Sequence, residues 1–138
     1  MVEYFPQLEV VLFPYTAKTK KVRKDSLFDA LKKCDVGAFG IKPFANNSLF
    51  EGSSAPNNPH AEEDDQRARL AIRRILCNPH IIPIPGLVSS HQVENVARAV
   101  KERRELDMAE AKKLTKVMDQ TWAKLPKSYQ WLKNWEYV

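Results

Sequence analysis

Three short apolar runs, each followed by a segment with helical spacing, constrain the fold most. The runs cover residues 8–13, 36–41 and 81–84. They are apolar at consecutive rather than alternate positions, so they predict strands covered on both faces, the type found in parallel sheets. Strands of this kind that alternate with helices are joined by right-handed crossovers. The sequence therefore predicts an α/β fold with about three parallel strands.

Two helical patterns connect the predicted strands. The first can be capped by Asp25 or Ser26 and ends near residues 32–33. The second runs over residues 61–77, with an acidic first turn and an apolar stripe along one face. Before it lies a loop, residues 44–60, that is rich in Asn, Ser, Gly and Pro. Loops of this length in compact domains are usually functional or disordered.

The stretch from residue 81 to residue 95 combines a strand, a glycine turn and the start of a helix. The apolar run stops at Gly86, and Ser89 followed by Gln92 has the spacing of a capping box. The free amides and the positive dipole end of such a helix can be satisfied by the cap, or they can hold a phosphate group. The local pattern is compatible with both roles.

The segment after residue 104 predicts one more helix and an aromatic tail. Asp107 and Glu110 have the spacing of a capping box at the start of this helix. Its apolar face would consist of Met108, Ala111, Leu114, Val117, Met118 and Trp122. Residues 129–138 are unusually aromatic, so we expect them to cover an apolar surface, either the chain's own core or a neighbouring subunit.

Composition excludes several functional classes. A length of 138 residues, 43% of them hydrophobic and 28% charged, suits one soluble domain over residues 1–138. No run approaches the roughly 18 to 20 apolar residues of a membrane span, and the N-terminus lacks the pattern of a secretion signal. We therefore expect a cytoplasmic protein. Cys34, Cys77 and the three histidines have no metal-ligand spacing, so no metal site is expected.

The net charge of +5 is concentrated in part at residues 18–24. Such a cluster can attract nucleic acid, but it is more often a solvated loop. It lacks the interleaved aromatic residues that stack on bases, and residues 62–65 are all acidic. We expect neither nucleic acid nor a membrane as a partner.

Four segments in series resemble the C-terminal part of the aldo-keto reductases. They are residues 10–15, 40–45, 71–79 and 84–86. Their order and spacing are similar to those of the family's last three barrel strands and their helices, so the resemblance covers residues 8–104 and leaves 105–138 as a helical extension. It implies a partial (β/α)8 TIM barrel. It also implies an oxidoreductase that reduces carbonyl groups with NADP(H) or NAD(H).

The resemblance implies cofactor-binding roles around the glycine turn. Contacts with the adenosine phosphate side of the cofactor are implied for Gly86, Leu87, Ser89 and Gln92. Asn95 is also a candidate, at a position where the family usually has an acidic residue just before its adenine-facing asparagine. Val96 takes the place of that asparagine. Gln92 takes the place of an arginine that many members use for the NADP phosphate, which leaves the choice between NADP(H) and NAD(H) open.

The resemblance also implies cofactor contacts in the loop after the second strand, which lies along the pyrophosphate in the family. Lys42, Asn46 and Ser48 are the candidates there. Asn46 and Asn47 replace a frequent Gly-Gly pair, whose backbone can approach phosphates closely. Thr16 stands where the family commonly has an asparagine facing the nicotinamide.

The family's catalytic residues have no counterpart in this sequence. The family uses a tyrosine as proton donor, tuned by a lysine, an aspartate and a histidine on earlier strands, and neither Tyr4 nor Tyr15 lies in that motif. We therefore assign no catalytic residue and expect this chain alone to be inactive. Three barrel strands leave two unpaired edges and one uncovered face, so a missing N-terminal half-barrel or a homo-oligomer is the expected partner. The alternative is a catalytically inactive interaction module derived from a barrel.

Overall fold

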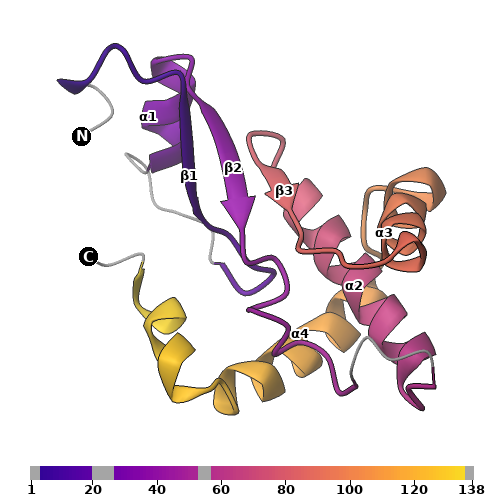
Figure 1. The fold of residues 1–138 in the computed structure, drawn as a ribbon. Helices are drawn as coiled ribbons and strands as arrows, with labels where there is room; N and C mark the ends of the chain where they lie inside the picture. The colour runs from indigo at the N-terminus through magenta and orange to yellow at the C-terminus, as the bar shows by residue number, and fades with distance from the viewer. Residues whose placement is uncertain (1–3, 20–26, 53–56, 136–138) are drawn as a thin grey trace.

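A parallel sheet with the strand order β1-β2-β3 forms one end of the molecule (Figure 1). The computed structural model describes residues 4–19, 27–52 and 57–135. The strands are β1 (Val10–Pro14), β2 (Gly37–Ile41) and β3 (Ile82–Ile84). Both pairings are parallel. The predicted α/β class with three parallel strands is therefore confirmed.

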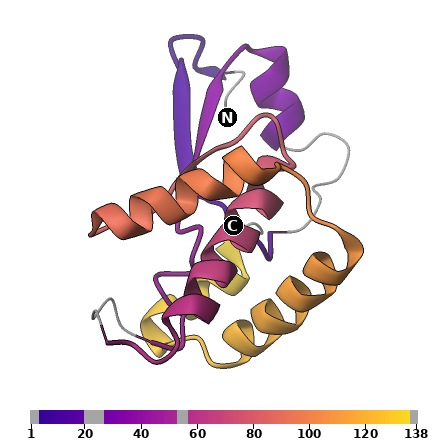
Figure 2. The same ribbon diagram turned by 90° about the vertical axis from the view of Figure 1, so that its right-hand side faces the viewer.

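The helices follow the strands in the predicted order. They are α1 (Leu27–Lys33), α2 (Ala61–Leu76), α3 (Ser90–Glu102) and α4 (Met108–Ala123), followed by the 3-10 helix η2 (Lys127–Lys133). The capping candidates Asp25 and Ser26 lie outside the described residues. Figure 2 shows α2 and α3 crossing between the sheet and α4. The start of α3 lies beside the first half of α2, where His91 contacts Asp65.

Only one face of the sheet is covered within the described chain. Phe13 of β1 and Ala38 of β2 pack with Leu31 of α1 and Ile75 of α2 in one apolar cluster. The opposite face has exposed apolar side chains, namely Val10, Leu12, Ile82 and Ile84. Leu12 and Ile82 pair with the same residue of β2, so they lie in one row across the sheet. The prediction that these strands are covered on both faces is wrong for the described residues, because no described element packs on this face.

A second apolar cluster joins α2, α3 and α4. Its buried members include Ile72 of α2, Ala99 of α3 and Leu114 and Met118 of α4. The predicted apolar face of α4 is too long, because Met108 is 91% exposed and Ala111 is also exposed. Polar contacts rather than apolar packing hold the first turn of α4, where Asp107 and Glu110 form the complete capping box that their spacing predicts.

The start of the long loop and the aromatic tail pack against each other. Residues 43–49 form consecutive turns, and Ala45 is fully buried in a cluster with Leu125 and Leu132. Trp135 packs on Phe13 of β1, with 5.7 Å between the ring centroids. Of the two surfaces expected for the tail, its described part therefore covers the chain's own core. This packing fixes the first half of the 44–60 loop as part of the core.

Candidate functional site

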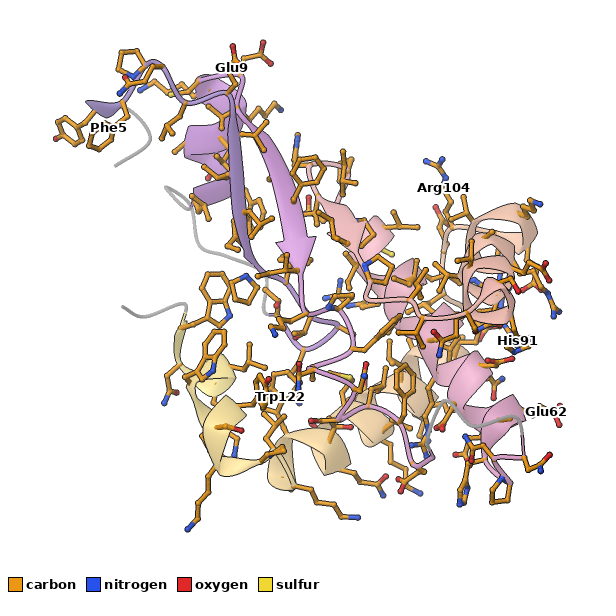
Figure 3. All side chains as sticks on the ribbon, viewed as in Figure 1. Phe5, Glu9, Glu62, His91, Arg104 and Trp122 are labelled. Carbon is orange, nitrogen blue, oxygen red and sulfur yellow. The ribbon has the colours of Figure 1, made fainter. Side chains whose placement is uncertain are left out.

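A groove of about 570 Å³ lies where the loops after β2 and β3 meet the first halves of α2 and α3. Its walls come from the loop after β2, from α2, from the glycine turn and from α3. The lining residues are Phe44, Asn47, Phe50, Gly52, Asn58, Ala61, Asp64, Asp65, Ala68, Gly86, Leu87, Val88, Ser89, His91, Gln92, Asn95 and Val96. Figure 3 shows the labelled His91 beside α2 at this end of the molecule.

The start of α3 is capped largely as its sequence predicts. Ser89 has an extended backbone, and its Oγ accepts a hydrogen bond from the Gln92 amide at 3.3 Å. The reciprocal bond of a capping box is displaced by one residue, because Gln92 Oε1 accepts from the Val88 amide at 2.8 Å. Helix geometry leaves the amides of Ser90 and His91 without an intrahelical acceptor. These amides and the helix dipole favour an anion at this position.

Gly86 leaves open space at the edge of the groove. A Cβ atom built on Gly86 meets no other heavy atom within 4 Å, and the backbone of Gly86 does not have a positive φ. Neither packing nor backbone conformation therefore requires glycine here. The missing side chain instead leaves room beside the first turn of α3.

The loop after β2 contributes Asn47 to the groove but not the three residues predicted there. Asn46 and Asn47 have φ values of 55° and 63°, a left-handed conformation that asparagine tolerates better than most residues. The pair thus adopts a backbone conformation that the Gly-Gly pair of the resemblance would also allow. Lys42 Nζ lies 3.4 Å from Asn46 Oδ1 and 5.3 Å from the ring centroid of Tyr129. Lys42, Asn46 and Ser48 lie outside the groove.

Asp64 anchors the end of that loop to α2. Its carboxylate accepts hydrogen bonds from the backbone amides of Glu51 and Gly52, both at 2.9 Å, and the residue is only 9% exposed. An acidic first turn is typical of helices in general, because it complements the helix dipole, and it does not mark Asp64 as a partner of the loop. Asp64 therefore belongs to the wall of the groove without having been predicted.

Arg67, one turn further along α2, binds the same loop. Its guanidinium donates to the carbonyl oxygen of Leu49 at 3.1 Å and to Glu63 at 2.8 Å. The hydrogen bond from Arg67 lowers the pKa of Glu63. Burial lowers the pKa of Arg67, but its hydrogen bonds to Glu63 and Glu51 raise it, and the net direction is upward. Arg67 thus stays charged and holds the loop against α2.

Asp65, Asn95 and His91 join α2 to α3 across the groove. Asp65 Oδ2 lies 2.7 Å from His91 Nε2, and the backbone oxygen of Asp65 accepts from Asn95 Nδ2 at 3.0 Å. Asn95 Oδ1 accepts from Arg69, so both ends of this buried amide are bound within the protein. Asn95 therefore lines the groove, and it also fixes α3 against α2.

The far end of α3 is held by Arg73, which is 4% exposed. Its Nε donates to the carbonyl oxygens of Ala99 and Arg103, both at 3.1 Å. Its two terminal nitrogens reach Glu102 at 2.5 Å and Glu110 at 3.1 Å. One buried side chain of α2 thus fixes the end of α3 and the start of α4.

No metal site is formed by the described residues, in which no group of three or more His, Cys, Asp or Glu side chains could hold an ion. Cys34 and Cys77 are free and exposed, and the three histidines are exposed as well. Among the helices of the described chain, none has the length and apolar character that crossing a membrane requires. The groove is therefore the candidate site that these residues offer.

Comparisons with protein-family models, with curated proteins and with solved structures find no match to this chain.

Proposed function

We propose that the chain is the cofactor-binding part of an aldo-keto reductase-like oxidoreductase, which reduces carbonyl groups with NADP(H) or NAD(H). The main support is the convergence of residues that the resemblance marks for the cofactor. Gly86, Leu87, Ser89, Gln92 and Asn95 all line one groove. These five residues belong to one turn and the first part of α3, whereas the other three candidates, Lys42, Asn46 and Ser48, lie outside the groove.

The chemistry of the groove suits a dinucleotide. The free amides at the start of α3 would bind a phosphate group on the adenosine side of the cofactor, and the space beside Gly86 would let that phosphate approach the backbone. The half-buried Phe50 supplies apolar surface for a base or a ribose, and its ring packs on the buried Phe44, with 5.1 Å between the ring centroids. A volume of about 570 Å³ lies within the usual range of small-molecule sites, roughly 300 to 1,000 Å³.

In this proposal the three strands are the last three of a (β/α)8 barrel. The exposed apolar face of the sheet would turn toward the barrel interior, and the outer edges of β1 and β3 would pair with further strands. An N-terminal half-barrel or a second copy of the chain would supply those strands. The proton-donating tyrosine and its partners would also have to come from outside this sequence, so we assign no catalytic residue and expect the chain alone to be inactive.

Calorimetric titration of the purified chain with NADH and with NADPH tests the proposal. We expect weak, saturable binding that tightens when an N-terminal aldo-keto reductase half-barrel is added. Gly86→Leu should weaken binding at least about tenfold, which corresponds to ~1.4 kcal/mol, because the new side chain would occupy the space of the ligand. It should not reduce stability, because a Cβ atom at this position meets no other heavy atom within 4 Å. Ala109→Leu, at an exposed position of α4, is the matched control. The absence of binding with and without the half-barrel would refute the proposal.

The exposed sheet face favours a second candidate, an interaction module without chemistry. Val10, Leu12, Ile82 and Ile84 form a contiguous apolar surface, which proteins usually bury against a partner or another copy. Sedimentation of the chain and of Leu12→Lys distinguishes the two candidates. Self-association that this substitution abolishes, in a chain that binds neither nucleotide, would favour the module.

A further inference from the structure

We propose that the groove selects a nucleotide whose ribose hydroxyls are free, as in NAD(H), over one with a 2′-phosphate, as in NADP(H), and that Asp65 is the discriminating residue. The inference rests on the proposed function and concerns the same groove. It settles a choice that the sequence left open, because Gln92 has no charge with which to favour either cofactor.

The charge of the groove disfavours a 2′-phosphate. Asp64 and Asp65 both line it, and none of its described lining residues is a lysine or an arginine. Arg69 directs its guanidinium to Asn95 Oδ1 and is not among the lining residues. The Asp64 carboxylate has a cation nearby, because Arg67 Nη1 lies 4.0 Å from its Oδ1. Asp65 faces the imidazole of His91, and the described residues that line the groove bring no lysine or arginine to it. A 2′-phosphate, with about −1.5 to −2 charges near neutral pH, would be repelled there.

The two carboxylates differ in whether they can accept a further hydrogen bond from a ligand. Asp64 is committed to the backbone, since each of its oxygens accepts from an amide of the loop after β2. Asp65 uses only Oδ2, in its contact with His91, and within the described part of the chain Oδ1 has no hydrogen-bond partner. A carboxylate oxygen only accepts hydrogen bonds, which suits the hydroxyl donors of a ribose diol. A phosphate dianion offers no such donor.

His91 orients Asp65 rather than offering a phosphate site of its own. Its Nε2 lies 2.7 Å from Asp65 Oδ2, so the ring nitrogen that faces the groove wall is already engaged. Asp65 is further fixed through its backbone oxygen, which accepts from the buried Asn95. The carboxylate is therefore held in one place, which is what discrimination between a hydroxyl and a phosphate requires.

Calorimetric titration of the full chain with four probes tests the inference. The probes are NADH, NADPH, ADP-ribose and ADP-ribose 2′-phosphate. We expect the unphosphorylated member of each pair to bind at least about tenfold more tightly, a difference of ~1.4 kcal/mol. Asp65→Asn should reduce this preference to about threefold or less, mainly by strengthening binding of the phosphorylated probes. Asp65→Glu, which keeps the charge, should retain a preference.

Glu62→Gln is the matched control, because Glu62 is an exposed residue of α2 that does not line the groove. Like Asp65→Asn, Glu62→Gln removes one negative charge from α2, but it should leave the preference for the unphosphorylated probes unchanged. NADPH binding as tight as NADH binding would overturn the inference and leave the proposed function standing. Equal weakening of all probes by Asp65→Asn would also overturn it. If none of the probes binds, either to the chain alone or in the presence of the half-barrel, the proposed function itself is wrong.

Discussion

Replacing Arg73 by methionine should destabilise the protein more than any change to a surface ion pair. Arg73 is 4% exposed and donates from all three guanidinium nitrogens. Methionine keeps much of the apolar stem but removes every one of these bonds. The carbonyl oxygens of Ala99 and Arg103 would lose their donor, and the carboxylates of Glu102 and Glu110 would lose their buried cation.

The magnitude follows from how exposed the abandoned partners are. Removing one partner of a fully buried ion pair costs about 3 to 5 kcal/mol. The side chains of Glu102 and Glu110 are 43% and 19% exposed, so water can partly replace the lost cation. We therefore expect a loss near the lower end, about 3 kcal/mol, in the free energy of unfolding. With a urea m-value of about 2 kcal/mol/M, the midpoint should fall by about 1.5 M.

Arg98→Met is the matched control for this measurement. Arg98 also binds Glu102, at 3.2 Å, but its side chain is 62% exposed and the pair has helical i,i+4 spacing. Such pairs contribute about 0.3 to 0.5 kcal/mol, so the urea midpoint should barely move. If Arg73→Met and Arg98→Met shift the midpoint equally, the claim that Arg73 fixes α3 and α4 is wrong.

Three further predictions concern the loop after β2 and the start of α4. Asp64→Asn should lower the free energy of unfolding by about 2 kcal/mol in urea titrations. The carboxylate now accepts hydrogen bonds from two backbone amides, and the NH₂ group of asparagine cannot accept one of them. An unchanged midpoint would contradict this role of Asp64. Asn47→Val should cost about 1 to 2 kcal/mol and Asn47→Gly should not, since φ is 63° there; equal thermal midpoints for the two variants would show that this backbone is not strained. The backbone amide of Glu110 and the Arg103 guanidinium lower the pKa of Asp107 from its ordinary 3.8. The folded state therefore binds a proton at Asp107 more weakly than the unfolded state does. The ionised carboxylate contributes to stability above its ordinary pKa, and this contribution is lost as the pH falls through the lowered pKa of the folded state. In urea titrations at a series of acidic pH values, Asp107→Asn should flatten that loss, and an unaltered pH profile would contradict the assignment.

The strands and helices could be predicted because their signals are local. Consecutive apolar residues mark the strands, and the acidic first turn and apolar stripe of α2 mark its length to within a residue. The bounds of the first strand differ from the prediction, because the apolar run predicts residues 8–13 and β1 covers Val10–Pro14. Its ends depend on the partner, because pairing with β2 begins at Val10 opposite Gly37.

The candidate site could be predicted only where its chemistry is local. Ser89 and Gln92 meet within one helical turn, so their spacing revealed the cap. Asp65 and His91 are 26 positions apart and meet only because α2 packs against α3. No spacing rule links them. Asp64 was likewise hidden, because its partners are backbone amides of a loop whose path the sequence does not specify.

An apolar run reveals that a strand needs cover, but not what provides it. Val11 and Phe13 of β1 meet the helices, while Val10 and Leu12 stay exposed on the other face. The same pattern would arise in a complete parallel sheet, since both faces are apolar in either case. The cover of the second face is therefore the point on which the barrel proposal and the interaction module differ.

The amide spectrum of ¹⁵N-labelled chain during a titration with NADH tests the proposed cofactor groove most directly. We predict saturable shifts that are largest at the amides of Leu87, Ser90 and His91, with smaller ones at Asn47 across the groove. Shifts confined to residues of α4 or of the sheet, or no saturable shift in the presence of the half-barrel, would contradict a nucleotide site at the start of α3.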